Sequence, residues 1–307
     1  MRLLPCLLLL AAATGLTQAG RTAESAVRPV SLIGTELRDP DWSAATRAAL
    51  EKDLLIARKV MEIAPEREDS WIWLGRRLAY LNRYEEAIGV FTAGLERFPG
   101  SYRLLRFRGR KLARSRQFER AIADYRRGLE LMEGVADSYE PDGIVNARNQ
   151  TLGSYRGNLH YYLGQTLWAV GDYAGTFAEM QRSIAEPLVQ NPDHRIATIY
   201  WRYLALRKLG RDEEAGALVR DVPAGLEMIE NSTYYDGVRF MQGALDHRTL
   251  EARGDAISRF AVAMDLHFRG EQREAELMWT DIITQSPQGF WPAETELLAA
   301  RASRERK

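Results

Sequence analysis

The chain has 307 residues, of which 46% are hydrophobic and 27% charged, and its 42 basic residues balance 42 acidic ones. This apolar fraction is ordinary for a globular protein. A net charge of zero argues against a protein that binds nucleic acid through a positive surface.

Residues 1–19, MRLLPCLLLLAAATGLTQA, are predicted to be a secretory signal peptide. Arg2 supplies the positive start, and the apolar run of residues 3–16 leads to a small-residue cleavage site at 17–19. This run is shorter than the about 20 apolar residues that a membrane-spanning helix needs, so we expect no stable membrane anchor. A retained leader is the alternative. The prediction places the protein outside the cytoplasm, in the periplasm or secreted.

Cys6 is the only cysteine of the chain and lies inside this leader, before most of its apolar run. A lipid-modified cysteine is expected after the run, so Cys6 does not fit a lipid anchor. Cleavage would leave no cysteine, and disulfides would then contribute nothing to the mature protein.

The next segments are expected to be an arm and a capping helix. Residues 20–40 are polar and aperiodic, which indicates a flexible arm. A helix is predicted from 42 to 63, with two adjacent apolar stripes that allow it to pack against two neighbours. Pro65 lies one repeat length before Pro99, at the equivalent position of a preceding unit. The helix therefore corresponds to the second helix of an incomplete repeat, and we expect it to cap the fold.

A pattern in residues 68–101 recurs in residues 102–135. The first unit carries Trp71, Leu74, Gly75, Leu78, Ala87, Phe91 and Pro99, and the second Leu105, Gly109, Leu112, Ala121 and Tyr125. Recurrence with a period of about 34 residues predicts two antiparallel helices per unit, here called A and B, which bury their apolar faces by stacking on neighbouring units. No segment alternates with period two over several strands, so the fold class is all-α.

Weaker copies of the unit follow, and two interruptions separate them. The weaker units are 157–190, 196–229 and 256–289, and the interruptions are 136–156 and 231–254. The first interruption is rich in polar side chains. It either folds into the inner side of the stack or adds a helical turn to the second unit. A closing helix near 292–303 completes a single folded body over residues 41–304.

The spacing of these units resembles that of tetratricopeptide-repeat (TPR) proteins. The order of leader, capping helix, WLGRRLAYLNRYEEAI, EPDG-x-x-NAR and LHYYLGQTLWAVGDY is similar to that of exported bacterial TPR proteins without an assigned activity. The resemblance implies an α-solenoid with N- and C-terminal capping helices. It also implies a concave wall of A helices that holds an extended peptide or a partner helix.

In this family the second, fifth, ninth and twelfth residues of each unit lie on the concave wall. The candidate peptide-binding residues implied here are Ile72, Arg76, Arg103, Arg106, Arg110, Asn158, Tyr161, Gln165, Trp168 and Tyr200. Arginines bind carboxylates through two hydrogen bonds and aromatic side chains add contact area, so an acidic or C-terminal partner segment would fit. Alternatively, the arginines pair with carboxylates of the solenoid itself and the aromatics pack under neighbouring helices.

No catalytic or cofactor signature occurs in the chain. The four histidines are far apart, and HExxH, GxSxG, Walker and dinucleotide-binding glycine patterns are missing. We predict a non-catalytic, exported protein–protein interaction scaffold without metal or cofactor, and make no prediction of its oligomeric state. One alternative is an accessory subunit that docks an envelope or cell-wall enzyme and presents its substrate. Another is an enzyme with a site built from Glu140, Asp142 and His160.

Overall fold

The computed structural model describes residues 30–306, so the predicted signal peptide lies outside the described residues. This part of the chain forms fourteen α-helices, a short 3-10 turn and two isolated β-bridges, with no strand. The helices are α1 (Ala44–Ile63), α2 (Glu68–Tyr80), α3 (Tyr84–Arg97), α4 (Tyr102–Arg114), α5 (Phe118–Leu131), α6 (Tyr155–Ala169), α7 (Tyr173–Ala185), α8 (Pro192–Lys208), α9 (Asp212–Arg220), α10 (Ser232–Met241), α11 (His247–Glu251), α12 (Ala256–Phe268), α13 (Gln272–Gln285) and α14 (Trp291–Glu305). The 3-10 turn η1 (Pro187–Val189) lies between α7 and α8. None of the described helices is both long and apolar enough to cross a membrane.

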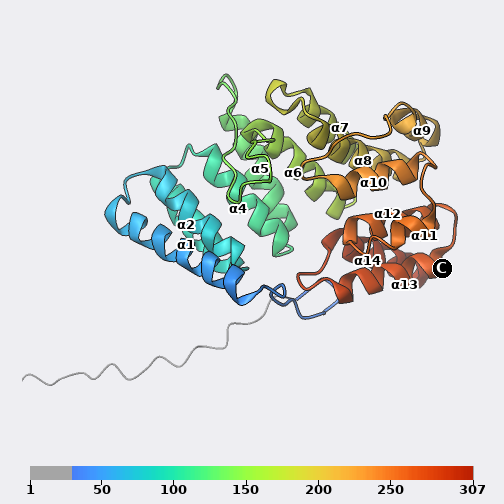
Figure 1. Ribbon diagram of the computed structural model, residues 1–307, viewed down its shortest axis with the longest axis horizontal. Helices are drawn as coiled ribbons and strands as arrows, with labels where there is room; N and C mark the ends of the chain where they lie inside the picture. The colour runs from blue at the N-terminus through green and yellow to red at the C-terminus, as the bar shows by residue number, and fades with distance from the viewer. Residues whose placement is uncertain (1–29, 307) are drawn as a thin grey trace, which may run out of the picture.

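The helices pack as consecutive hairpins that stack along a curved path (Figure 1). The A–B pairs are α2–α3, α4–α5, α6–α7, α8–α9 and α12–α13. The A helices α2, α4, α6 and α8 also contact one another in turn. Because the inner elements of a curved stack lie closest together, these A helices form the concave wall. The predicted all-α solenoid is confirmed.

Two glycines at equivalent positions of the first two repeats make room for the large side chains inside their hairpins. Gly75 on α2 faces the ring of Phe91 on α3, and Gly109 on α4 faces the ring of Tyr125 on α5. A Cβ atom at Gly109 would lie 2.7 Å from Cε1 of Tyr125. Each glycine therefore allows an aromatic ring of helix B to pack directly on helix A.

The turn after each of these A helices contains a residue with left-handed backbone. Glycines take this position at Gly171, Gly210 and Gly270, but Asn82 (φ 58°) and Arg116 (φ 60°) take it in the first two repeats. The left-handed conformation costs a residue with a side chain about 1–2 kcal/mol, whereas glycine adopts it freely. Both non-glycine turns contact the C-terminal end of the chain, which offsets this cost.

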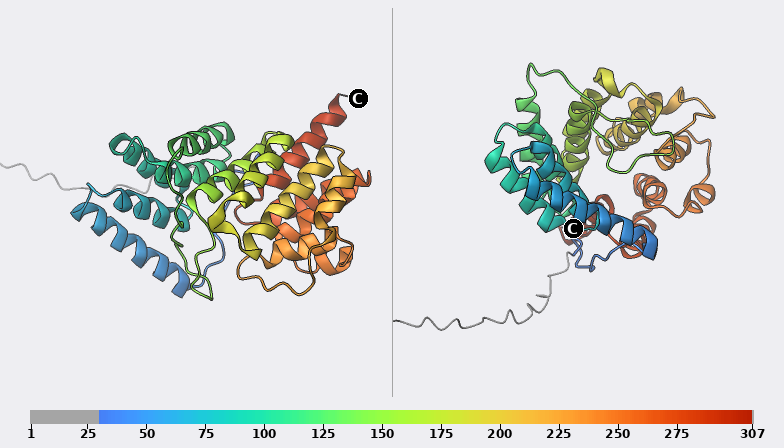
Figure 2. Two further views of the ribbon diagram at one scale, coloured as in Figure 1. Left: turned by 90° about the horizontal axis from the view of Figure 1, so that it is seen from above. Right: turned by 60° about the vertical axis from the view of Figure 1, so that its left-hand side comes forward.

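The C-terminal end of the stack returns to the first two repeats and closes the curve, as the right-hand view of Figure 2 shows. Glu294 of α14 is fully buried and accepts a hydrogen bond from Nε of Arg116 at 3.1 Å. Gln288 contacts Asn82 and accepts a hydrogen bond from the Tyr84 hydroxyl at 3.1 Å. The solenoid is therefore a nearly closed ring rather than an open arc.

The described part of the N-terminal segment lies across this closure. We expected a flexible arm over residues 20–40, but residues 30–40 are anchored. The backbone N–H of Leu32 donates to Oε2 of Glu294 at 2.8 Å, and that of Arg38 donates to the carbonyl of Pro287 at 2.7 Å. The segment thus ties the first helix to the last repeat.

The expected interruption at 231–254 contains helices α10 and α11. Helix α10 packs between α8 and α12, which is the place of an A helix in the stack. A Cβ atom at Gly237 of α10 would lie 2.7 Å from Cε2 of Tyr200 on α8, so the two helices pack closely. A shortened hairpin therefore continues the solenoid through this segment. Its second helix has only five residues, too few to give a repeat pattern.

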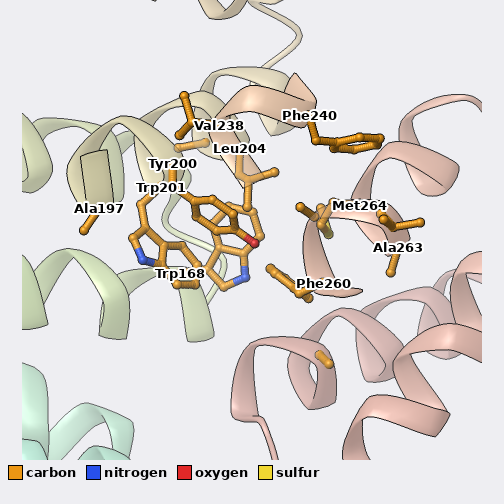
Figure 3. Close-up of a cluster of buried hydrophobic side chains, with 14 of the residues drawn as sticks. Trp168, Ala197, Tyr200, Trp201, Leu204, Val238, Phe240, Phe260, Ala263 and Met264 are labelled. Carbon is orange, nitrogen blue, oxygen red and sulfur yellow. The ribbon is translucent and has the colours of Figure 1, made fainter. Parts of the chain in front are cut away.

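Two apolar clusters fill the stack. The cluster of the C-terminal half includes Trp168, Tyr200, Trp201, Phe260, Met264 and Trp279, several of which are shown in Figure 3. The cluster of the N-terminal half includes Ile72, Phe91, Leu104, Phe107, Leu112 and Leu159. These side chains come from successive hairpins, so neighbouring repeats stabilise one another.

Helix α1 uses one of its two apolar stripes in this packing. Leu54 and Ala57 are buried against the first repeat, whereas Ile56, Val60 and Ile63 are exposed. The helix contacts α2, and its outer face is open in the described structure.

Candidate functional site

The loop between α5 and α6, residues 136–154, folds across the concave wall. Two arginines of α2 hold it there. Arg76 donates from Nη1 to the carbonyl of Pro141 at 2.8 Å, and Arg77 donates from Nη1 to the carbonyl of Gly143 at 2.9 Å. The first interruption therefore folds into the inner side of the stack, which is one of the two alternatives that the sequence left open. We call residues 136–154 the concave loop.

The side chain of Glu140 fixes the loop most firmly. Its Oε2 lies 2.6 Å from Nε of Arg106 and accepts a hydrogen bond from Nδ2 of Asn158 at 3.0 Å. Both members of the ion pair are buried, with 7% and 8% of their side-chain surfaces exposed. Burial is the largest influence on Arg106 and opposes its charge, but Glu140 and the neighbouring tyrosines together outweigh it, so the pKa of the guanidinium is raised.

At its far end the concave loop reaches the segment before α10. Asn146 donates from Nδ2 to Oε1 of Glu230 at 2.7 Å, and Arg148 lies 2.9 Å from Glu227 in an ion pair. The segment itself is held by buried Asp193, which accepts the backbone N–H of Glu230 at 2.7 Å and those of its two neighbours. The loop thus joins the early repeats to α10 across the groove.

A cavity of about 300 Å³ lies beside the loop on the concave wall. It is lined from α4, α6, α8, α10, the concave loop and the turn before α10, chiefly by Arg106, Arg110, Glu140, Asp142, Asn158, Tyr161, Tyr162, Gln165, Asp193, His194, Glu230 and Tyr234. This volume is at the small end of the range for ligand pockets. It accepts a few side chains or an extended chain, whereas a helix about 10 Å wide would not enter.

Burial shifts the pKa of two groups in the cavity. It lowers the pKa of His194 to about 4, and the ring Nε2 lies 2.7 Å from Oγ of Ser183, so the imidazole is neutral at neutral pH. Burial and then the charge of Glu230 raise the pKa of Asp142. Of the two arginines that line the cavity, Arg106 pairs with Glu140, whereas Arg110 has no acidic partner among the described residues.

Helix α4 carries four arginines along its inner face, Arg103, Arg106, Arg110 and Arg114, at spacings of three and four residues. We call them the arginine stripe. Arg103 pairs with Glu68, with Nη1 and Oε2 2.8 Å apart, and Arg106 has the loop carboxylate described above. The first half of the stripe is therefore neutralised within the protein.

The second half of the stripe is positive. Within residues 30–306, Arg110, Arg114 and the adjacent Lys111 form no ion pair with a carboxylate. The guanidinium of Arg110 lies 4.3 Å from the ring centroid of Tyr162, and Nζ of Lys111 lies 5.7 Å from that of Tyr84. Burial and then the neighbouring arginines lower the pKa of Lys111, and burial and Arg110 lower that of Arg114. These cations repel one another without a counter-charge.

The ten predicted peptide-binding residues divide into three groups. Arg106, Arg110, Asn158, Tyr161 and Gln165 line the cavity. Arg76 and Arg103 are bonded to the protein's own loop carbonyl and carboxylates. Ile72, Trp168 and Tyr200 are buried in the apolar clusters with at most 1% of their surface exposed, so a partner does not reach them in this structure. Binding at the cavity residues stays a prediction.

The residues considered for an enzymatic site do not come together. Glu140 and Asp142 line the cavity, but Nδ1 of His160 lies 2.6 Å from Glu179 on α7, in the hairpin of its own repeat. His247 pairs with an aspartate of α12 at 2.8 Å. In the part of the chain that the structure describes, no three His, Cys, Asp or Glu side chains are grouped to hold a metal ion.

Several cavity and wall residues were missed from the sequence. Arg114 continues the three- and four-residue spacing of the arginines on α4, which the sequence itself shows, and Lys111 is adjacent to Arg110. Asp193 and His194 belong to the first turn of α8, which begins at Pro192, ahead of the expected start of the fourth repeat at residue 196. The repeat pattern gave no sign of this earlier start.

No protein-family model matches the chain, and no curated protein matches it. Similar solved structures include the crystal structure of YrrB, titled a TPR protein with an unusual peptide-binding site, with a TM-score of 0.43, 14% identity, and coverage of 81% of this chain and 97% of that one. The APC/C heterotetramer Cut9–Hcn1 has a TM-score of 0.37 and 15% identity, over 82% of this chain and 46% of that one. Naa15/Naa10 bound to HypK-THB also has a TM-score of 0.37 and 15% identity, over 84% and 37%. The all-helical stack is consistent with tetratricopeptide repeats.

Proposed function

We propose that the protein is an exported, non-catalytic interaction scaffold that binds a segment of a partner protein in its concave groove. The cavity beside the concave loop is the observation that carries this proposal. It lies on the inner wall, and four A helices and the concave loop present polar side chains to it. Such a convergence suits recognition of a polar chain segment more than packing within the solenoid.

The supports of the cavity keep its shape before a partner arrives. Buried Glu140 anchors the concave loop and buried Asp193 anchors the opposite segment, each through several hydrogen bonds or ion contacts. A groove held in this way loses little conformational entropy on binding. Export is supported by the leader pattern of residues 1–19.

Photo-crosslinking tests the binding surface. p-Benzoylphenylalanine in place of Glu230, which is exposed at the cavity, should form an adduct with a partner from envelope extract. The same group in place of Leu277, 63% exposed on the outer helix α13, should form none. Adducts of equal yield at both positions, or none at 230, would overturn the proposal.

Export has a separate test. Residues 1–40 fused to alkaline phosphatase should give an active enzyme outside the cytoplasm, and mass spectrometry of the exported full chain should show a mature N-terminus near residue 20. A fusion that stays inactive in the cytoplasm would remove the exported part of the proposal and leave the binding surface unaffected.

A further inference from the structure

The unbalanced half of the arginine stripe is the strongest unexplained feature of the concave wall. Arg110, Lys111 and Arg114 lie within about one turn of α4 and form no ion pair with any described residue. The solenoid supplies acids to the inner cations around them, since Arg106 pairs with Glu140 and Arg116 with Glu294. Three adjacent inner cations left without an acid indicate a place where the counter-charge comes from outside.

The surroundings make this place suitable for an anion. Arg110 lines the cavity, and its guanidinium lies over the ring of Tyr162, which fixes the plane of the fork. All three cations are half-buried on the inner wall, where interactions between charges are stronger than at an open surface. Burial is the main reason that the pKa of Lys111 and Arg114 is lowered, and a bound carboxylate would relieve the repulsion from neighbouring arginines that adds to it.

The protein's own loop shows how the stripe binds an acidic chain. In the concave loop, Glu140 places its carboxylate on Arg106 while the next residue, Pro141, gives its backbone carbonyl to Arg76. A side-chain acid and an adjacent main-chain oxygen are thus held together by arginines of two neighbouring A helices. One turn further along α4, Arg110 and Arg114 provide guanidinium groups that could bind a carboxylate in the way that Arg106 binds Glu140.

The cavity is too small for a helix, and the spacing of the free cations matches an extended ligand. Arg110 and Arg114 are four residues apart, which is about 6 Å along a helix axis. An extended chain places side chains on one face every second residue, about 6.6 Å apart. Carboxylates at alternate positions of an extended segment therefore match the two guanidinium groups, and Lys111 lies beside them.

We propose that Arg110, Lys111 and Arg114 bind an extended acidic segment of a partner protein that carries Asp or Glu at alternate positions. The side-chain carboxylates, rather than the terminal carboxylate of the chain, make the contacts. This inference rests on the proposed function, because it assigns the chemistry of the segment that enters the concave groove.

Fluorescence anisotropy with designed peptides tests it. The probe is a labelled, C-terminally amidated peptide with glutamate at alternate positions, and the matched peptide has glutamine there. The full-length protein should bind the glutamate peptide at least tenfold more tightly. Arg110→Gln with Arg114→Gln should remove most of that difference. Arg120→Gln with Arg127→Gln, which removes the same charge from the exposed face of α5, should leave it unchanged.

The outcomes separate this inference from the proposed function. Three results would each overturn the acidic-segment assignment. The first is no binding of the glutamate peptide, and the second is an equal loss of binding in both double variants. The third is binding that a free C-terminal carboxylate supports in place of the side-chain acids. Equal competition by a single-stranded oligonucleotide of the same charge would also overturn it, because the site would then be a general polyanion surface. A crosslink at position 230 together with any of these results would leave the scaffold proposal standing. The melting temperature of Arg110→Gln with Arg114→Gln should not fall, since the change removes repulsion.

Discussion

Replacing Glu294 by glutamine should open the ring at its closure. Glu294 is the acid of a buried ion pair with Arg116, and it also accepts the backbone N–H of Leu32. The side chains are 0% and 7% exposed. Glutamine keeps the shape of the side chain and one acceptor oxygen but leaves the guanidinium buried without a counter-charge.

The expected loss of unfolding free energy follows from this burial. Removing one partner of a buried ion pair typically costs about 3–5 kcal/mol. Because glutamine keeps the bond to Leu32, we expect the lower end, about 3 kcal/mol. The matched control is Glu62→Gln, whose pair with Lys59 is more than 60% exposed on both sides and should contribute about 0–1 kcal/mol.

Guanidinium unfolding followed by tryptophan fluorescence measures both losses. Amide exchange in residues 30–40 should rise in Glu294→Gln, since this segment is bonded to the same carboxylate. Small-angle scattering should show a larger radius of gyration. If Glu294→Gln and Glu62→Gln lost the same stability, with no change in exchange, the reasoning about the closed ring would be wrong.

Three further predictions concern the loop, the cavity and the hairpins. Glu140→Gln should leave Arg106 buried without its acid, destabilise the fold by about 3 kcal/mol and make the concave loop sensitive to limited proteolysis; resistance equal to wild type would contradict this. Because burial lowers the pKa of His194 to about 4, the unfolded chain takes up its proton first, so stability should fall as pH falls from about 6.5 to about 4, by up to about 3 kcal/mol, and be fully present above that range. A pH series of urea unfolding should show a flatter profile in His194→Gln. Gly109→Ala should cost about 1–3 kcal/mol in thermal unfolding because its Cβ meets a tyrosine ring, whereas Gly89→Ala on the exposed face of α3 should be neutral or stabilising.

The repeated core was predictable because it depends on local spacing. Gly75 and Gly109 hold equivalent positions in successive repeats, and so do the aromatic residues Phe91 and Tyr125 that pack on them. Because each hairpin is packed in the same way, the residues that pack it recur in the sequence at a fixed period. The paired helices follow from this pattern, and the resemblance to TPR proteins implied the solenoid.

The candidate site was less predictable because it depends on contacts between distant segments. From its position in the fourth repeat, Tyr200 was expected to lie on the surface of the concave wall. Helix α10 packs directly over it through Gly237. Arg106 was expected to meet a partner, yet it meets Glu140 of the protein's own loop. Nothing in the local sequence shows which arginines of a stripe already have an acid. The folded structure is needed to distinguish an arginine such as Arg106, which already has an acidic partner, from Arg110, which has none among the described residues.

The closure between the last helix and the first repeats has a mechanical consequence. An open solenoid is elastic, and its radius can increase or decrease when it binds a partner. Here, widening would require Arg116 and Glu294 to separate inside the protein, so the diameter of the inner space is set when the chain folds. Adjustment to a bound segment is therefore confined to the tip of the concave loop at Ile144 and Val145, which is mostly exposed, because the rest of the loop is anchored.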